Sequence, residues 1–76
     1  MKLYKFTFKI QRLKASFTGC CKTNHFAQWF FDKAPYGFHL LSYKECSEVE
    51  FKNYNDFTKK FTTDMVLENY KSSYNE

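Results

Sequence analysis

The 76-residue sequence has few of the residues that build nucleotide sites, with two glycines and one proline. Loops that cradle phosphate groups need several closely spaced glycines, so this class of motif is excluded. Arginine is also scarce, because eleven of the twelve basic residues are lysine. Domains that read nucleic-acid bases usually draw more heavily on arginine. No apolar run approaches the roughly 18 residues of a membrane-spanning helix, and no charged-then-apolar leader opens the chain.

Cysteine occurs in an odd number, at Cys20, Cys21 and Cys46. This is not the disulfide framework of a small secreted domain, so we expect a reducing, cytoplasmic location. Together with His25 and His39, the cysteines are ligand types that zinc prefers. The Cys-Cys-x3-His spacing is not a recognised zinc spacing, so we expect no bound metal and no cofactor. A zinc-stapled mini-domain is the second alternative.

Aromatic residues are abundant instead, at 22% of the chain, and ten of them are phenylalanine. Each large ring buries about 150–250 Å², which suits a chain this short. Residues 25–31, His-Phe-Ala-Gln-Trp-Phe-Phe, predict a broadly apolar helix that a sheet and a second element must cover. We expect one contiguous core made of Phe6, Phe8, Trp29, Phe30, Leu40, Phe51, Phe57 and Phe61.

Period-two alternation predicts the strands. Lys2–Gln11 has an aromatic face and a basic face, which indicates a half-buried strand. Residues 12–19 fit either a return strand or an irregular connection. Phe38–Lys44 is predicted as a strand that Leu40-Leu41 buries on both faces. Glu48–Lys52 is predicted as a further strand, with Val49 and Phe51 inward and a hairpin turn at residues 45–48.

Capping residues and four-residue spacing predict the helices. Thr23 or Asn24 is a suitable N-cap for the aromatic helix, which Ala34-Pro35-Tyr36-Gly37 ends. Asn55 offers a second N-cap, and the recurrence of apolar side chains at positions 57, 61 and 65 predicts a helix from there. Met65–Tyr70 is a last short strand in the alternative interpretation, and residues 71–76 are expected to fray.

These elements predict one compact α+β domain over residues 1–76, with an antiparallel sheet of three to four strands and two helices packed on one face. A strand at residues 65–70 would give the order of a ferredoxin-like fold. Such a fold hosts many functions and by itself identifies none.

Enzyme chemistry finds little support. A Cys21 nucleophile paired with His25 or His39 would need geometry that the sequence does not show. Glu48 and Glu50 lie on the predicted wet face of a strand, where carboxylates are usually solvated. We therefore expect a protein that is not an enzyme.

The charge is distributed unevenly along the chain. Residues 1–33 carry seven basic groups and one acid, whereas residues 34–76 carry five and seven. A basic N-terminal surface favours a partner with an acidic surface. The candidate binding residues are the basic row and the tyrosines that could anchor an interface: Lys5, Lys9, Arg12, Lys14, Tyr36, Tyr43 and Tyr54.

We expect a small non-enzymatic binding protein whose macromolecular partner is a protein rather than a nucleic acid, with no membrane involved. Lys, Asn, Tyr and Phe are frequent while Gly, Pro, Ala and Arg are scarce, a usage that low-GC coding DNA produces, as in many phages. The concrete version is a phage or mobile-element inhibitor or modulator of a host protein or nucleoprotein complex, such as a defence complex, acting in the host-cell cytoplasm. The alternative is a nucleic-acid-binding module that uses the basic strand face.

Overall fold

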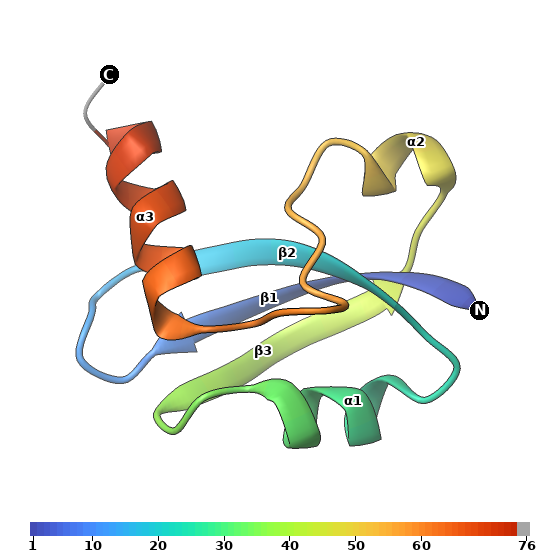
Figure 1. The fold of residues 1–76 in the computed structure, drawn as a ribbon, viewed down its shortest axis with the longest axis horizontal. Coiled ribbons are helices and arrows are strands. Elements are labelled where there is room, and N and C mark those ends of the chain that lie inside the picture. Colours follow the sequence, from blue (N-terminus) through green and yellow to red (C-terminus); the bar gives the residue numbers. More distant parts are fainter. Residues whose placement is uncertain (75–76) are drawn as a thin grey trace.

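The computed structural model describes residues 1–74, with side chains described for residues 1–68. Three strands form an antiparallel sheet in the order β2-β1-β3, and helices accompany it (Figure 1). The fold is α+β, as the sequence predicts. In chain order the elements are β1 (Lys2–Ile10), β2 (Ser16–Thr23), α1 (Phe26–Lys33), β3 (Phe38–Glu45), α2 (Glu48–Phe51) and α3 (Thr63–Tyr74).

The central strand is β1, and its two faces follow the alternation in the sequence. Phe6, Phe8 and Ile10 are buried on one face, while Leu3 and Lys5 lie on the other. The return strand left open in the sequence is β2, which pairs with β1 from Lys2–Thr23 to Lys9–Ser16. β3 pairs with the other side of β1, with one irregularity in register between Thr7 and Phe8.

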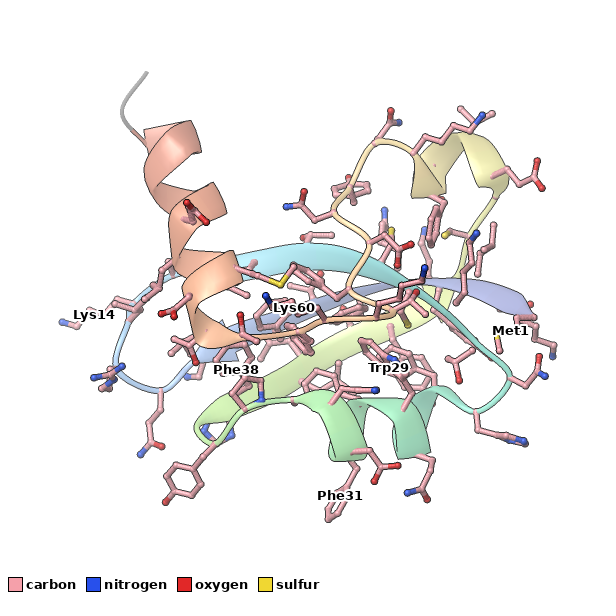
Figure 2. The ribbon with its side chains drawn as sticks, viewed as in Figure 1. Met1, Lys14, Trp29, Phe31, Phe38 and Lys60 are labelled. Atoms are coloured by element: carbon pink, nitrogen blue, oxygen red, sulfur yellow. The ribbon has the colours of Figure 1, made fainter. Side chains whose placement is uncertain are left out.

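The core is a cluster of aromatic rings between the sheet, α1 and the segment that precedes α3 (Figures 1 and 2). Trp29 lies parallel to Phe61, with ring centroids 5.7 Å apart and planes 9° apart. Gly19 is required beneath the cluster, because a Cβ there would collide with the ring of Phe57. Other members of the buried cluster are Phe6, Phe8, Ile10, Cys21, Phe26, Phe30, Phe38 and Val66.

Six of the eight predicted core residues are buried, and two depart from the prediction. Leu40 is only partly buried, although it packs against the cluster. Phe51 is half-buried and lines a groove with Leu3, on the opposite face of β1. The prediction that Leu41 is buried is wrong, because 53% of its surface is exposed.

The predicted strand at residues 48–52 is wrong, and so is the hairpin turn before it. This segment forms the short helix α2, which Ser47 caps by accepting a hydrogen bond from the Glu50 amide at 3.2 Å. Val49, predicted to point inward, is 75% exposed. The Ser47 hydroxyl satisfies an amide in the first turn of the helix. In a strand, that amide would need an acceptor on a neighbouring strand.

The predicted helix from Asn55 is also wrong. Residues 55–57 are extended and run beside β2, where the Cys20 amide donates to the Asn55 carbonyl and the Phe57 amide donates to the Cys20 carbonyl, both at 2.8 Å. Phe57 and Phe61 therefore reach the core from a segment without regular structure. α3 begins only at Thr63, where Thr62 accepts a hydrogen bond from the Met65 amide at 3.2 Å.

Helix ends differ from the prediction in smaller ways. The N-cap of α1 is His25, which makes no capping side-chain bond, while the Thr23 hydroxyl accepts the His25 amide proton at 3.1 Å. Residues 65–70 are helical, so the alternative of a last strand is wrong. Residues 71–74 belong to α3, residues 75–76 lie outside the described part of the chain, and the fraying of residues 71–76 stays a prediction.

Within residues 1–74, no helix is both long enough and apolar enough to cross a membrane.

Candidate functional site

The predicted basic row is interrupted at Lys5. Its ammonium donates a hydrogen bond to Glu50 Oε2 at 2.6 Å and lies 5.3 Å from the ring centroid of Tyr54. The hydrogen bond raises the pKa of Lys5 and lowers the pKa of Glu50. The charge of Lys5 is thus paired with Glu50 of α2. The prediction placed Lys5 in a free basic row, and the structure instead holds it in this ion pair.

The remaining cations of the row are exposed. Lys9 lies near the end of β1, and Arg12 and Lys14 lie in the turn that leads to β2. Figure 2 shows Lys14 at the end of the molecule opposite Met1. Among the side chains of residues 1–68, these three cations have no ion pair. Lys9 and Lys14 line one surface hollow, whereas Arg12 lines another. We call Lys9, Arg12 and Lys14, which all lie at the end of β1 that leads into β2, the basic cluster.

The three predicted tyrosines do not share one surface. Tyr54 lies beside Lys5, on the face that α2 covers. Tyr36 is fully exposed in the turn between α1 and β3. Tyr43 stacks on Phe26, with ring centroids 4.3 Å apart, and keeps half of its surface exposed. Tyr36 and Tyr43 therefore belong to the stretch of chain that runs from α1 through β3, whereas Tyr54 does not.

Two further exposed apolar residues in the stretch from α1 to β3 were missed by sequence reasoning. Phe31 is 84% exposed and points away from the body of the molecule at the outer face of α1 (Figure 2). Leu41 is exposed on β3. A helical-wheel count identifies Phe31, because the buried positions 26, 29 and 30 define a stripe from which position 31 is rotated by about 100°. We call Phe31, Tyr36, Leu41 and Tyr43 the α1–β3 surface.

The two edge strands of the sheet, β2 and β3, differ in whether their outer edges are hydrogen-bonded. The outer edge of β2 is covered where residues 55–57 pair with Cys20. In the described part of the chain, β3 has one hydrogen-bonded neighbour, β1, so its outer edge is open. Unpaired strand edges are templates for binding another strand.

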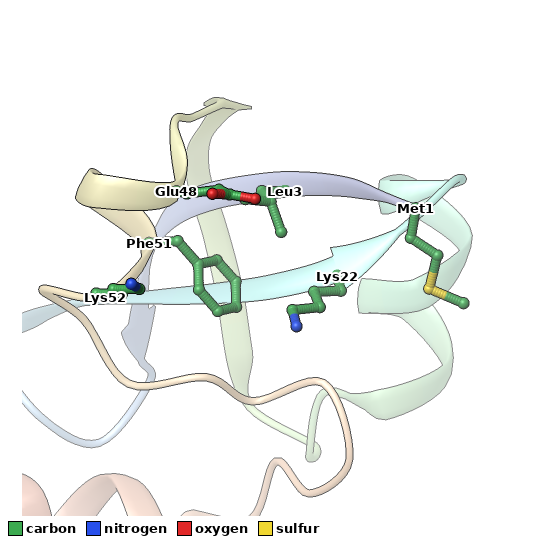
Figure 3. Close-up of a pocket in the computed structure, with 6 residues that line it drawn as sticks. All are labelled: Met1, Leu3, Lys22, Glu48, Phe51 and Lys52. Carbon is green, nitrogen blue, oxygen red and sulfur yellow. The ribbon is translucent and has the colours of Figure 1, made fainter.

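A concave feature lies on the face of β1 opposite the aromatic core. It is an open groove of about 700 Å³ between the start of β1 and α2, with Leu3 and Phe51 as its apolar part (Figure 3). The Lys22 ammonium lies 5.5 Å from the Phe51 ring centroid. Lys52, Glu48 and the exposed Met1 complete the lining. With one carboxylate and no histidine in its lining, the groove offers contacts for binding and no acid–base pair.

The predicted absence of a metal and of a catalytic thiol can be compared with the geometry. Within the described residues, no group of three or more His, Cys, Asp or Glu side chains is placed to hold a metal ion. Cys20 and Cys21 are buried on opposite faces of β2, and burial raises the pKa of each thiol to about 12. His25 and His39 are exposed. Because burial keeps the Cys20 and Cys21 thiols protonated, neither of these two residues is favoured as a reactive thiolate.

The chain matches no protein-family model, no curated protein and no solved structure. What the protein does must therefore be inferred from its own surface.

Proposed function

We propose that this chain is a non-enzymatic binding module that engages another protein through the α1–β3 surface. The observation that carries the proposal is the run of exposed apolar side chains between residues 31 and 43. Four large apolar side chains that are at least half exposed fall within this single stretch. Exposed aromatic side chains in such density are typical of protein interfaces, where they act as anchors.

A protein partner suits this surface better than a nucleic acid. Binding of single strands needs aromatic platforms set among cations that follow the phosphate backbone. Here the cations Lys9, Arg12 and Lys14 lie at one end of β1. Tyr54 lies beside Lys5, whose charge is paired with Glu50. The exposed rings instead accompany α1 and β3, where Asp32 and Glu45 mix with Lys33 and Lys44. Mixed charge around apolar anchors is the composition of a protein-binding rim.

The low-GC, phage-like amino-acid usage supports a more specific form of the proposal. In this form the chain is a phage or mobile-element inhibitor or modulator that acts on a host protein or nucleoprotein complex.

The test is affinity capture from a lysate of host cells, with and without nuclease. The interface variant is Phe31→Ser with Leu41→Ser, and the matched control is Val49→Ser. Val49 is 75% exposed on α2, outside the α1–β3 surface. We expect the wild type and the control to capture the same protein after nuclease treatment, and the interface variant to lose it.

Two results would contradict the proposal. Capture that disappears with nuclease would show that nucleic acid is the ligand. Capture that is equal for all three proteins would show that the α1–β3 surface is not the interface. Circular dichroism of the interface variant excludes unfolding as the cause of a loss, because both substituted side chains are exposed.

A further inference from the structure

We infer that the partner contributes an extended acidic segment that adds to the outer edge of β3 as a fourth strand of the sheet. This inference rests on the proposed function, because it describes how the partner binds. Addition of a strand to an exposed sheet edge is a recurrent mode of peptide recognition. The main-chain hydrogen bonds supply affinity, and alternate side chains supply specificity.

The first support is the orientation of the β3 backbone. The Cys46 amide donates to the Leu3 carbonyl at 2.9 Å, so the main-chain groups of Cys46 face β1. Main-chain groups alternate in direction along an antiparallel strand, so those of Lys44 also face β1. The N–H and C=O groups of Tyr43 and Glu45 consequently point outward, toward the open edge. A register irregularity lies between Thr7 and Phe8, so the regular part of the edge is the end of β3.

The second support is the side-chain pattern along this edge. Tyr43 lies opposite Phe6, on the core face, and half of its surface is exposed. Lys44 lies opposite Lys5, on the other face, and is exposed. An added strand therefore meets an apolar ring on one face and a cation on the other. Residues of such a strand that alternate between apolar and acidic match both faces.

The third support is the local charge. Lys5 is held by Glu50 and Glu45 is 3.9 Å from Lys2, whereas Lys44 has no ion pair among the described side chains. Lys9 and His39 face each other farther along the same two strands, and both are exposed. Lys44 also lies close enough to Glu50 to help lower the pKa of that carboxyl, so Glu50 offsets part of the positive charge of Lys5 and Lys44. Lys9 has no ion pair among the described side chains, so this face keeps an excess of positive charge, which favours carboxylates on the added strand.

A second copy of this chain fits the edge less well than an acidic segment. Each chain carries a net charge of +4. Antiparallel pairing of two β3 strands, with Tyr43 of one opposite Glu45 of the other, would place the two Lys44 side chains directly opposite each other on one face. Like charges at such positions are destabilising, so the charge disfavours self-association.

The test uses the peptide acetyl-Val-Glu-Val-Glu-Val-Glu-amide as the probe and its lysine counterpart, acetyl-Val-Lys-Val-Lys-Val-Lys-amide, as the control. Two-dimensional ¹H–¹⁵N NMR of the full chain follows each titration. We expect the glutamate peptide to shift the amides of Tyr43 and Glu45 and to slow their hydrogen exchange about tenfold at saturation. The lysine peptide should leave them unchanged.

The matched variant is Lys44→Glu, which changes one exposed side chain. We expect this variant to bind the lysine peptide in preference to the glutamate peptide, because the sign of the charge beside the edge is reversed. An unaltered peptide preference would overturn the inference. So would the absence of any shift at Tyr43 and Glu45 with millimolar glutamate peptide.

Two further outcomes separate this inference from the proposed function. If Tyr43 and Glu45 shift with protein concentration alone, a second copy occupies the edge, and the inference is overturned. If the host protein is captured through Phe31 but neither peptide perturbs β3, the proposed function stands and strand addition fails. If the glutamate peptide binds at β3 but no host protein is captured, the edge is a peptide site and the proposed function fails.

Discussion

At the scale of single residues, Lys5 and Glu50 show how tertiary structure changes the meaning of a charge. In the sequence, Lys5 belongs to a basic row on a wet strand face. In the structure, α2 brings Glu50 against it, 45 positions away in the chain, at a distance of 2.6 Å. The ion pair links α2 to the central strand, and it leaves the Lys5 charge less available to a binding partner.

We predict that Glu50→Gln lowers the melting temperature most at neutral pH. The folded state lowers the pKa of Glu50, so its contribution is present above the ordinary carboxyl pKa of about 4.3 and is lost as the pH falls through the folded value. The folded state raises the pKa of Lys5, so that contribution is lost only as the pH rises through the folded lysine value. Melting curves of wild type and variant should therefore differ at pH 7 and converge near pH 2.

The control for this experiment is Glu48→Gln on the same short helix. Glu48 is exposed and has no ion pair among the described side chains. The difference in melting temperature between Glu48→Gln and wild type should therefore change little with pH, unlike the difference for Glu50→Gln. A Glu50→Gln difference that persists unchanged at pH 2 would contradict a role for the ion pair.

At the scale of elements, α1 carries both buried and exposed aromatic side chains within eight residues. Trp29 is buried against Phe61, whereas Phe31, two positions later, is 84% exposed. The two rings are similar in chemistry and opposite in environment. The helix thereby provides the core with one face and presents a large apolar side chain on another.

We predict that Trp29→Ala destabilises the fold by roughly 3–5 kcal/mol, which approaches the whole stability of a small domain. Phe31→Ala should change the free energy of unfolding by no more than about 0.5 kcal/mol, because its ring has few contacts to lose. Urea denaturation of the two variants measures both values. A large loss for Phe31→Ala would show that its ring packs in the folded chain and would remove it as a binding anchor.

The elements that sequence reasoning predicted are those whose pattern is local. β1 and α1 carry their periodicity in consecutive residues, and both form as expected. Residues 48–52 are too few to separate alternation from a helical turn, and the Ser47 cap decides in favour of a helix. The spacing of Phe57 and Phe61 imitates a helix, although the backbone at 55–57 pairs with β2.

The candidate site was less predictable because it depends on contacts between distant segments. The sequence proposes Tyr36 and Tyr43 as binding residues, and both side chains are exposed. It could not show that Lys5 is held by Glu50, or that residues 55–57 cover the edge of β2 and leave β3 open. These facts follow from the position of α2 and of the segment after it, which local periodicity does not determine.

At the scale of the whole molecule, the charges that give the net +4 are unevenly distributed. Lys9, Arg12 and Lys14 lie at the end of β1 that leads into β2, and no described acid forms an ion pair with them. A glutamate in place of Lys5 would face Glu50, so charge reversal there would also disturb the fold.

We therefore propose charge reversal at the exposed lysines, with the double variant Lys9→Glu and Lys14→Glu. Both side chains are exposed, so the fold should persist, while association with the captured partner should slow by roughly tenfold at low salt. The difference from wild type should shrink as ionic strength rises, because salt screens exposed charges. Stopped-flow or surface-plasmon kinetics at two salt concentrations measures both effects.

The matched control is Lys59→Glu with Lys60→Glu, which makes the same change in net charge in the exposed segment before α3 (Figure 2). If the partner approaches the basic cluster, this pair should slow association much less than the pair at positions 9 and 14. Equal slowing by both pairs would mean that the partner responds to total charge alone. No slowing by either would mean that encounter depends on the apolar rings of the α1–β3 surface, with the lysines serving only to keep the domain soluble.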